Sequence, residues 1–424
     1  MIHLILLTIV LNLESTKQYF KVNADSNYID FNDYKMKFNK KYLNLEDELK
    51  HKIVFNKRLK IINENNKNPN KLNTFGINKF TDRLDEELPK LGFKMNLNVS
   101  KQNEIKNVNL NLKGISTLNI PNSFWSCNEW TNLCGNIINQ GDCGSCYAAA
   151  IANDAQIRYN YILKRMYLSK NTFTGKFAIQ NLIDCGNDKG CDGGSSDSTL
   201  MNTRIILLEK DYPYEDFNTS CIDDECIEYV KECRYNDNMK PIMKVDGLTY
   251  FSNLDWETIK TLIYNKGSFI TAMNADDLNY YDGSSIWSCN ENIEEINHAV
   301  VVDGYGEEFI NDKHIKYLWV RNSWGNDWGY NGHFRINFDN SCGINNKIKI
   351  DDSTYDIYNF IPDYIIDDDI IDEIINENEN ENENKNNKTI IIIISIIAAI
   401  LVIFGIIAII AIIILVVLLI KNKK

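Results

Sequence analysis

The feature that most constrains this chain is a short segment in which two cysteines, three positions apart, lie among glycines. Residues 140–150 read Gln-Gly-Asp-Cys-Gly-Ser-Cys-Tyr-Ala-Ala-Ala. The second cysteine, Cys146, opens an apolar run to Ile162 with few helix breakers, so we expect a helix that begins at Cys146, with Ser145 or Gly144 as its cap. A thiol there lies at the positive end of the helix dipole, which lowers the thiol pKa and favours the reactive thiolate.

A Cys-x-x-Cys pair by itself is also typical of a disulfide, a redox pair or half of a zinc site. Two motifs far downstream favour another interpretation: residues 297–300 read Asn-His-Ala-Val, and residues 322–325 read Asn-Ser-Trp-Gly. Together with Gln-Gly-x-Cys-Gly-Ser-Cys, in this order and at this approximate spacing, they resemble the papain/cathepsin family of cysteine proteases. The resemblance covers roughly residues 30–350. It implies an α+β, papain-like two-lobed fold, in which the active cleft lies between a helical lobe and a β-barrel-like lobe.

The resemblance assigns a catalytic role to four residues. Peptide hydrolysis needs a nucleophile and a proton donor for the leaving amine, and Cys146 with His298 would supply both as a thiolate–imidazolium pair. Asn322 would orient the imidazole, and Trp324 would shield that bond from water. Gln140 would donate its side-chain amide to the oxyanion, together with the backbone N–H of Cys146. Of the five histidines, only His298 opens an apolar run that could hold a ring rigidly.

The substrate-binding residues are predicted by position in the same resemblance. Glycines after Cys191 would let a substrate backbone approach and pair. A pocket for the second residue before the cut would be apolar, with a lysine at its floor that disfavours a basic side chain; that lysine reaching to solvent is the alternative. The predicted substrate-binding residues are Gly193, Gly194, Ser196, Ala272, Ile296, Asn297, Trp324 and Lys347. One departure from the family lies next to the nucleophile, where Tyr147 replaces the usual Trp, and we expect repacking there, with activity retained.

Eleven cysteines lie between Cys127 and Cys342, and removing a free Cys146 leaves an even number, which fits an oxidising environment. The spacing from Tyr212 favours Cys221 as the partner of Cys185, although the sequence around Cys233 also resembles the family site. The pairs that the resemblance implies are Cys143–Cys191, Cys289–Cys342, and Cys185 with Cys221 or, as the alternative, Cys233. The leftover cysteine with Cys226, and Cys127 with Cys134, would form further bridges. No array of two Cys-x-x-Cys pairs occurs, so we expect no metal and no cofactor.

The N-terminal part of the chain is predicted to be an inhibitory propeptide, residues 28–93. Apolar residues recur there at helical spacing, and the family's helical pattern is partly kept, with Phe, Ile and the last Asn matched. The positions of that pattern are Asp47, His51, Phe55, Arg58, Ile62 and Asn66. A second propeptide signature, Gly-x-Asn-x-Phe-x-Asp, is intact as Gly76, Asn78, Phe80 and Asp82.

The remaining domain limits come from composition and period. Residues 1–15 resemble a secretory signal peptide, and residues 94–119 a linker that contains the activation cleavage and a glycosylation sequon at Asn98. Residues 120–350 would be the catalytic domain, helix-rich to about residue 230. Its predicted strands are 242–248, 268–273, 298–305, 317–320 and 333–338.

The C-terminal region is predicted to anchor the protein in a membrane. Residues 351–388 are acidic and without period, which indicates a stalk. Residues 390–420 carry no charge and are long enough to span a bilayer, and the basic tail 421–424 would stay cytoplasmic. The expected localisation is thus the secretory pathway, as a single-pass type I membrane protein of a lysosome-like vesicle or the cell surface. A GPI signal is the alternative for the apolar segment.

Composition restricts the function classes. The net charge is −13 and no basic patch occurs, so nucleic-acid binding is not expected. We predict a monomeric cysteine endopeptidase, made as a zymogen, that acts on protein or peptide substrates and is inhibited by its own propeptide. Two rival functions are a catalytically inactive surface interaction protein and a disulfide oxidoreductase that uses Cys143 and Cys146. The sequence does not identify the natural substrate.

Overall fold

The computed structural model describes residues 29–68, 72–95, 120–129, 135–166, 173, 175–186, 189–215, 221–222, 225–226, 232–289, 295–345, 347–350, 353–356 and 359–366. All of them lie in the first of two units, Met1–Ile366. The signal peptide, most of the linker, the sequon and the apolar segment 390–420 therefore lie outside the described residues.

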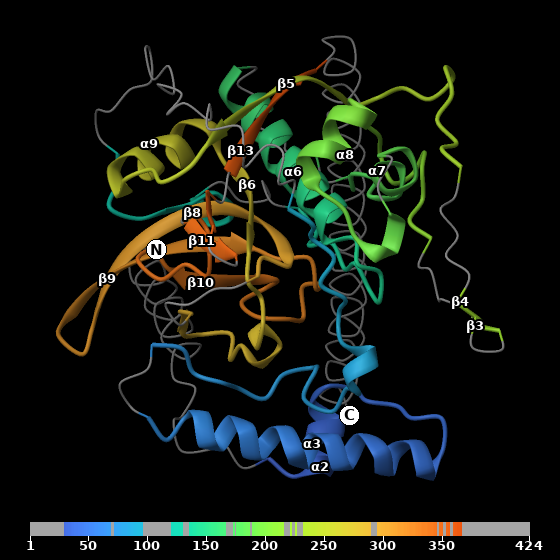
Figure 1. Ribbon diagram of the computed structural model, residues 1–424, viewed down its shortest axis with the longest axis vertical. Coiled ribbons are helices and arrows are strands. Elements are labelled where there is room, and N and C mark those ends of the chain that lie inside the picture. The colour runs from blue at the N-terminus through green and yellow to red at the C-terminus, as the bar shows by residue number, and fades with distance from the viewer. Residues whose placement is uncertain are drawn as a thin grey trace, which may run out of the picture. The chain divides into compact units, whose positions relative to one another are not determined.

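Helices occupy the N-terminal segment and most of the chain between residues 146 and 203. The helices and 3-10 turns are α2 Phe31–Lys37, α3 Leu45–Asn65, η1 Asp85–Glu87, α5 Ser126–Glu129, α6 Cys146–Met166, α7 Gln180–Cys185, η2 Gly190–Asp192, α8 Ser196–Thr203, α9 Trp256–Lys266 and η3 Leu278–Tyr280. In Figure 1, α6, α7 and α8 (green) lie together on one side of the strands β8, β9 and β10 (orange).

The helix that follows the cysteine pair is buried on all sides. It begins at Cys146, as predicted, and its first turns are the small residues Ala148, Ala149 and Ala150, each at most 1% exposed. These small side chains let neighbouring elements pack on every face of the first turns, and the polar residues that follow, such as Asn153 and Asp154, are buried with hydrogen-bond partners from the protein. Here α6 packs against β8, β6 and α8, so its N-terminus is held where the two lobes meet.

Most of the strands form the second lobe. The strands are β1 Phe124–Trp125, β2 Ile205–Ile206, β3 Cys221–Ile222, β4 Glu225–Cys226, β5 Met243–Phe251, β6 Phe269–Met273, β7 Ile286–Trp287, β8 His298–Ile310, β9 Lys313–Arg321, β10 His333–Asn337, β11 Lys347–Ile350, β12 Ser353–Asp356 and β13 Asn359–Ile365. Among the described residues the main sheet has the order β2-β5-β13-β6-β8-β9-β10-β7, and β1 pairs with β8. The five predicted strands are present as β5, β6, β8, β9 and β10, with ends that differ by a few residues.

The strands on either side of β8 fix the register at its start. Ala299 pairs with Ala272 of β6, and the same antiparallel register sets His298 opposite Met273. On the other side Val301 pairs with Arg321, the last residue of β9. Since His298 and Asn322 then lie at the same end of neighbouring strands, the sheet brings the two motifs together although 24 positions separate them.

The predicted stalk needs a correction at its N-terminal end. Residues 351–388 were expected to be without structure, yet Asn359–Ile365 form β13, inserted between β5 and β6. Phe360 and Ile361 are buried, and Tyr364 donates its hydroxyl to Asp154 of α6 at 3.0 Å. The acidic composition of the region concealed a short segment whose apolar residues complete the core.

The predicted membrane topology is also corrected. In the part of the chain that the structure describes, no helix combines the length and the apolar character needed to cross a bilayer. The predicted membrane localisation depended on residues 390–420, which lie outside the described residues. That localisation is not supported. We therefore no longer assign the chain as a single-pass type I membrane protein.

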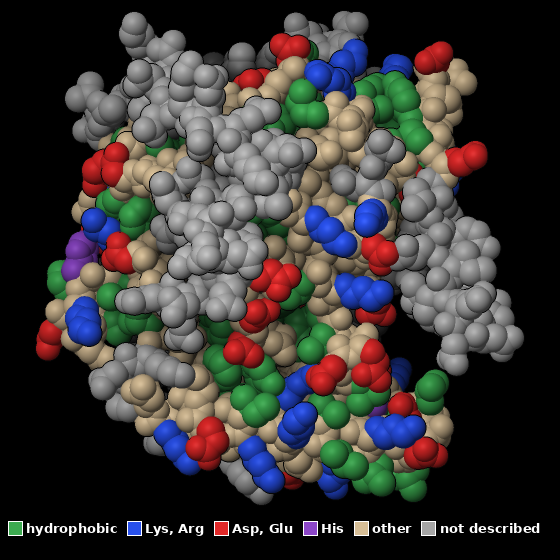
Figure 2. All heavy atoms as spheres, in the orientation of Figure 1, with side chains coloured by type: hydrophobic (Ala, Val, Ile, Leu, Met, Phe, Trp, Pro, Cys, Tyr) green, Lys and Arg blue, Asp and Glu red, His purple; other side chains and the backbone are tan. Residues whose placement is uncertain are grey.

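Two helices of the N-terminal segment pack on each other beside the second lobe (Figure 1). Asp30 caps α2 and Asn44 caps α3, each by accepting backbone N–H groups of the first turn. One face of α3 is buried, and its other face exposes Leu45, Leu49 and Ile53. Figure 2 shows basic, acidic and hydrophobic side chains interspersed over this part of the surface.

Candidate active site

Cys146 lies at the N-terminus of α6 and is the one cysteine reported free among the described residues. Its side chain is 0% exposed. Burial raises the pKa of the thiol, although the backbone N–H groups of Ala299 and Gly92 next to the sulfur act in the opposite direction. This differs from the lowered pKa expected from the helix dipole, because the thiol is fully buried in the zymogen and its charged form is not hydrated.

One ring nitrogen of His298 forms a hydrogen bond, and the other has no partner among the described residues. Its Nε2 lies 2.7 Å from Asn322 Oδ1, which also accepts the backbone N–H of Ser323, so that oxygen must face the ring and Nε2 must carry the proton. Nδ1 is buried and has no hydrogen-bond partner among the described residues. The ring of Trp324 lies 5.3 Å from the imidazole, centroid to centroid. Burial lowers the pKa of His298 to about 4, although the bond to Asn322 acts to raise it.

Gln140 is fully buried and its amide is oriented from both ends. Nε2 donates to the carbonyl oxygens of Lys90 at 3.0 Å and Cys143 at 2.9 Å. Oε1 accepts the hydroxyl of Ser323 at 2.6 Å, which fixes which end of the amide donates. Ser323 is thus a positioning residue to which the sequence analysis gave no role, although it lies inside the Asn-Ser-Trp-Gly motif.

The N-terminal segment runs through the predicted substrate strip. Gly194 N–H donates to Gly92 O at 2.9 Å, and Lys94 N–H donates to Gly194 O at 2.9 Å, which makes a parallel β-bridge at Phe93. Phe93 N–H also donates to Asn297 O at 3.0 Å. A Cβ at Gly92 would lie 1.8 Å from Gly144 O, so only glycine permits this approach.

The other predicted pocket residues are partly accounted for. Ala272 and Ile296 are 3% and 6% exposed, and Ser196 donates its hydroxyl to Tyr147 O at 2.9 Å. Tyr147 itself is buried and donates to Gly190 O at 3.0 Å, so the residue that replaces Trp is fully packed. The backbone of Lys347 belongs to β11, but its side chain lies outside the described residues, so its place at a pocket floor stays a prediction.

Two of the predicted disulfides are present, and the third has a different partner. Cys143–Cys191 and Cys289–Cys342 are bonded as expected, which excludes a redox pair of Cys143 with Cys146. Cys185 is bonded to Cys233, one of the two partners that the sequence left open, and not to Cys221, which the spacing from Tyr212 favoured.

Two contacts explain why Cys233 is the partner. Arg234 N–H donates to the hydroxyl of Tyr212 at 3.0 Å, and its guanidinium pairs with Glu215, which holds this segment beside the end of α7. The backbone of Cys221, in contrast, lies opposite that of Cys226 in the antiparallel β3–β4 hairpin. Cys127 is also disulfide-bonded, and its predicted partner lies outside the described residues.

The second predicted signature, Gly76 to Asp82, joins the N-terminal segment to the rest of the molecule. Asn78 Nδ2 donates to Asn279 O at 2.7 Å and Tyr281 O at 3.1 Å. A Cβ at Gly76 would lie 2.6 Å from Asp282 Cα, and the ring of Phe80 meets Trp324 edge-on at 5.7 Å. Phe80 therefore covers the tryptophan that flanks His298.

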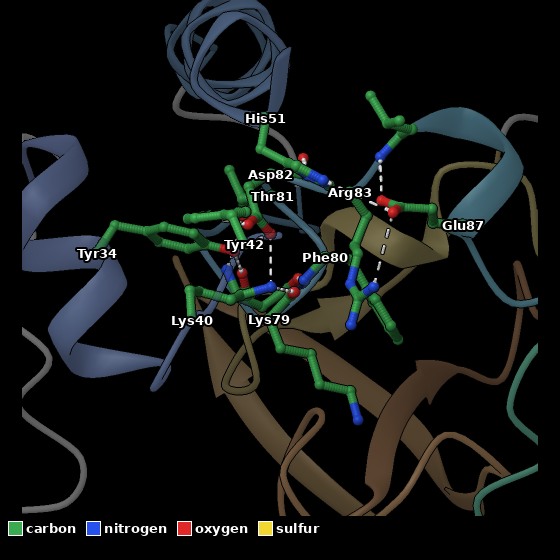
Figure 3. Close-up of polar contacts among 12 residues, drawn as sticks. Tyr34, Lys40, Tyr42, His51, Lys79, Phe80, Thr81, Asp82, Arg83 and Glu87 are labelled. Carbon is green, nitrogen blue, oxygen red and sulfur yellow. Dashed lines mark hydrogen bonds and ion pairs between the residues drawn. The ribbon is translucent and has the colours of Figure 1, made fainter. Parts of the chain in front are cut away.

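Asp82 connects this signature to the two helices (Figure 3). Its carboxylate accepts the hydroxyls of Tyr34 at 2.7 Å and Tyr42 at 2.8 Å, and it pairs with Lys40 Nζ at 2.5 Å. Burial alone would raise the pKa of Asp82, but Lys40 and the two hydroxyls hold it below its ordinary value. Asp82 is therefore ionised, and its backbone carbonyl lies 2.9 Å from His51 Nδ1 of α3.

The helical pattern of α3 is buried against the same segment. His51, Phe55, Arg58 and Ile62 form its buried face. Arg58, which departs from the family pattern, donates Nη1 to Phe80 O at 2.6 Å and Nη2 to Asp85 Oδ1 at 2.7 Å. The departure is therefore accommodated, since the guanidinium satisfies carbonyl groups that a shorter side chain would not reach.

A free thiol at a helix N-terminus, an imidazole fixed by an amide, and an N-terminal segment laid over both define a thiol protease in its precursor form. Comparison with known proteins identifies the family. The family described as "Papain family cysteine protease" matches residues 120–351, and "Cathepsin propeptide inhibitor domain (I29)" matches residues 31–88. The chain belongs to the papain family of cysteine proteases. Neither match extends beyond residue 351, so neither supports the predicted membrane anchor.

Relatives and solved structures agree with this assignment. The chain is 30% identical over 352 residues to the viral cathepsin of Heliothis zea nuclear polyhedrosis virus, covering 79% of this chain and 85% of the relative. It is 30% identical over 333 residues to the viral cathepsin of Autographa californica nuclear polyhedrosis virus, covering 75% and 90%. The fold is similar to digestive procathepsin L2 proteinase from Tenebrio molitor larval midgut, with a TM-score of 0.62, 25% identity, and coverage of 78% and 98%. The protein is a papain-like cysteine endopeptidase, made as a zymogen with its propeptide as intramolecular inhibitor.

Proposed function

We propose that, once the propeptide is removed, Cys146 and His298 form a thiolate–imidazolium pair that hydrolyses peptide bonds. The thiolate attacks the carbonyl carbon, and the imidazolium protonates the leaving amine, which leaves a thioester on Cys146. His298 then takes a proton from water, whose oxygen attacks the thioester and releases the acid and the thiol. Gln140 Nε2–H and the backbone N–H of Cys146 stabilise the oxyanion of both tetrahedral states.

One observation carries this proposal. The imidazole of His298 is fixed at Nε2 by Asn322, and its Nδ1 is buried without a partner among the described residues. The next residue in the strand, Ala299, has its backbone N–H next to the sulfur of Cys146. A buried, unpaired ring nitrogen is costly, and its use as the partner of the thiolate accounts for it.

The contacts of the propeptide support a direct mode of inhibition. Lys90 O accepts the Gln140 amide proton that the oxyanion would need, and Gly92 covers the sulfur. Phe93 and Lys94 pair with Gly194, where a substrate backbone would bind. The propeptide therefore occupies the oxyanion site, the nucleophile and the substrate strip together.

For the acyl side of the substrate, we propose that Gly193, Gly194 and Asn297 bind backbone, and that Ser196, Ala272 and Ile296 line the pocket for the second residue before the cut. Lys347 at the floor would disfavour a basic residue there. Profiling with a peptide library tests the pocket, and a strong preference for arginine at that position contradicts the placement of Lys347.

The activating cleavage is proposed to fall between residues 94 and 119, freeing a catalytic domain that starts near residue 120. The test is to incubate the full chain at mildly acidic pH and follow its mass and its activity on a quenched peptide. We expect cleavage in that segment and a parallel rise in activity, with labelling of Cys146 by an epoxide thiol probe. The Cys146→Ala chain is the control and should neither cleave itself nor be labelled. Activity in that variant would refute the role of Cys146.

A further inference from the structure

The cleft contains a cation-binding position that the propeptide itself fills. Lys79 Nζ donates to Trp324 O at 2.7 Å and forms an ion pair with Asp327. The lysine side chain is only 16% exposed, although that of Asp327 is 71% exposed. A partly buried ammonium whose two acceptors are a carbonyl and a carboxylate occupies a defined site.

The backbone at this position leaves room for the ammonium. Gly325 has a φ of +80°, and a Cβ built on it would lie 3.4 Å from Lys79 Nζ and 3.0 Å from Asp327 Oδ1. The left-handed turn at Gly325 therefore turns the carbonyl of Trp324 and the carboxylate toward one point. Both acceptors belong to the catalytic domain and remain after the propeptide leaves.

The location of this position relative to the reacting bond follows from His298. The imidazolium has to reach the leaving amine, so the side of the cleft beyond His298 binds the residues that follow the cut. The ring of Trp324 lies 5.3 Å from the imidazole, and Asp327 comes three residues later. Along the propeptide, Lys79 contacts Trp324, Gly92 then comes next to Cys146, and Phe93 pairs with Gly194, so the Lys79 position and the Gly194 strip come before and after Cys146 along that segment.

The catalytic-domain surface around this position is also negatively charged. A cavity of about 700 Å³ next to Lys79 is lined mostly by propeptide residues, and the catalytic domain contributes one part of its wall. The residues that the catalytic domain contributes to its lining are Asn139, Gly141, Asp142 and Asp327. They include two carboxylates and no cation, so removal of the propeptide leaves a negative surface on the leaving-group side.

We propose that Asp327 and the carbonyl of Trp324 bind the cationic side chain of a substrate lysine or arginine at the first or second position after the scissile bond. The inference depends on the proposed function and adds a specificity determinant to it. Lys79 of the propeptide is then a stand-in for that substrate residue, held in place until activation. Because Asp327 is largely exposed, the preference is modest and weakens as salt is added.

The experiment uses mature enzyme obtained by acid activation of the full chain. The substrates are quenched fluorescent peptides that have the same residues before the cut. They carry lysine, norleucine or glutamate at each of the two positions after it. We expect kcat/KM to be about three- to tenfold higher for lysine than for norleucine at low ionic strength, and lower still for glutamate. Asp327→Asn should bring the lysine-to-norleucine ratio close to one, mainly by lowering kcat/KM for the lysine peptide.

The control variant is Asp192→Asn, which removes a carboxylate from the other side of Cys146 and should keep the preference for lysine. A ratio near one in the unaltered enzyme, or a ratio that survives Asp327→Asn, overturns the inference while the enzyme remains active. Equal loss of the preference in both variants means a general charge effect and also overturns it. Failure to cleave any of the peptides refutes the proposed function instead, and the inference with it.

Discussion

The carboxylate of Asp82 ties both propeptide helices to the segment that enters the cleft. Its partners come from α2 and from the connection to α3, and its neighbour Phe80 covers Trp324. The pKa of Asp82 is lowered, so its contribution to stability is present above the ordinary value of about 4 and is lost only as the pH falls through the lower folded value. Asp82 is therefore not the group that titrates at mildly acidic pH.

Replacing Asp82 by Asn should loosen the propeptide at neutral pH, because the buried ammonium of Lys40 loses its counter-charge. In the non-cleaving Cys146→Ala chain we expect a loss of about 3 kcal/mol in the free energy of unfolding, measured by urea denaturation at pH 7. The matched control is Asp85→Asn, whose carboxylate is 84% exposed in its pair with Arg58 and should change stability by less than about 1 kcal/mol. Equal effects of the two variants would contradict this role for Asp82.

His298 gives the zymogen a pH dependence in the range where activation is expected. Its pKa is lowered to about 4 in the folded zymogen, from an ordinary value of 6.5. The unfolded chain therefore binds a proton that the folded zymogen does not between these values, so stability should fall by about 3 kcal/mol as the pH drops from 6.5 to 4. Urea denaturation of the Cys146→Ala chain across this range measures the slope.

In that background His298→Gln should flatten the profile, whereas His314→Gln should not. His314 is the matched control because its side chain is 43% exposed. Superimposable profiles for the parent and the His298 variant would show that another group titrates.

At the scale of elements, the end of α7 shows why the spacing along the chain could not identify the disulfide partner of Cys185. The helix ends at Cys185, and the hydroxyl of Tyr212, which donates to the Asp184 carboxylate, accepts the N–H of Arg234. These contacts bring Cys233 to the helix end, while spacing along the chain pointed to Cys221. Spacing gives only the number of residues between two cysteines. An inserted hairpin changes that number without changing which cysteine lies next to Cys185 in the folded protein.

Removal of the Cys185–Cys233 bridge should destabilise the protein, since it closes a loop with a sequence separation of 48 residues. For the double variant Cys185→Ser, Cys233→Ser we expect a loss of about 4 kcal/mol, read from thermal or urea unfolding. The comparison is Cys221→Ser, Cys226→Ser, which removes cysteines only from the β3–β4 hairpin and should cost much less. Mass spectrometry of unreduced peptides checks the pairing directly, and a peptide that links Cys185 to Cys221 would contradict it.

For the whole molecule, the propeptide changes both the access to the nucleophile and its ionisation. In the zymogen Cys146 is fully buried, burial raises its pKa, and that of His298 is lowered, so the pair is held neutral. Removal of the propeptide returns water and leaves the α6 dipole and His298 to favour the thiolate. Under the proposed mechanism, inhibition would thus combine steric cover with suppression of the charge-separated pair.

Alkylation of Cys146 by iodoacetamide at pH 6 should accordingly be more than about tenfold faster once the propeptide is cleaved away, because the sulfur becomes accessible and the burial that raises the thiol pKa is relieved. The rates are measured on zymogen and mature enzyme by mass spectrometry of the α6 peptide. Cys146→Ser provides the background. Similar rates in both forms would mean that the thiol is already exposed and ionised in the zymogen.

The sequence by itself determined the α6 helix that begins at Cys146, the principal strands and the positions of the motifs, because helix caps, alternation and glycine requirements are local. Its identification of the family was confirmed, while the catalytic roles remain proposals. Only the tertiary structure decided the partner of Cys185, the insertion of β13 into the sheet and the raised pKa of the thiol. Each of these depends on which distant segments exclude water from one another, and that information is absent from local spacing and composition.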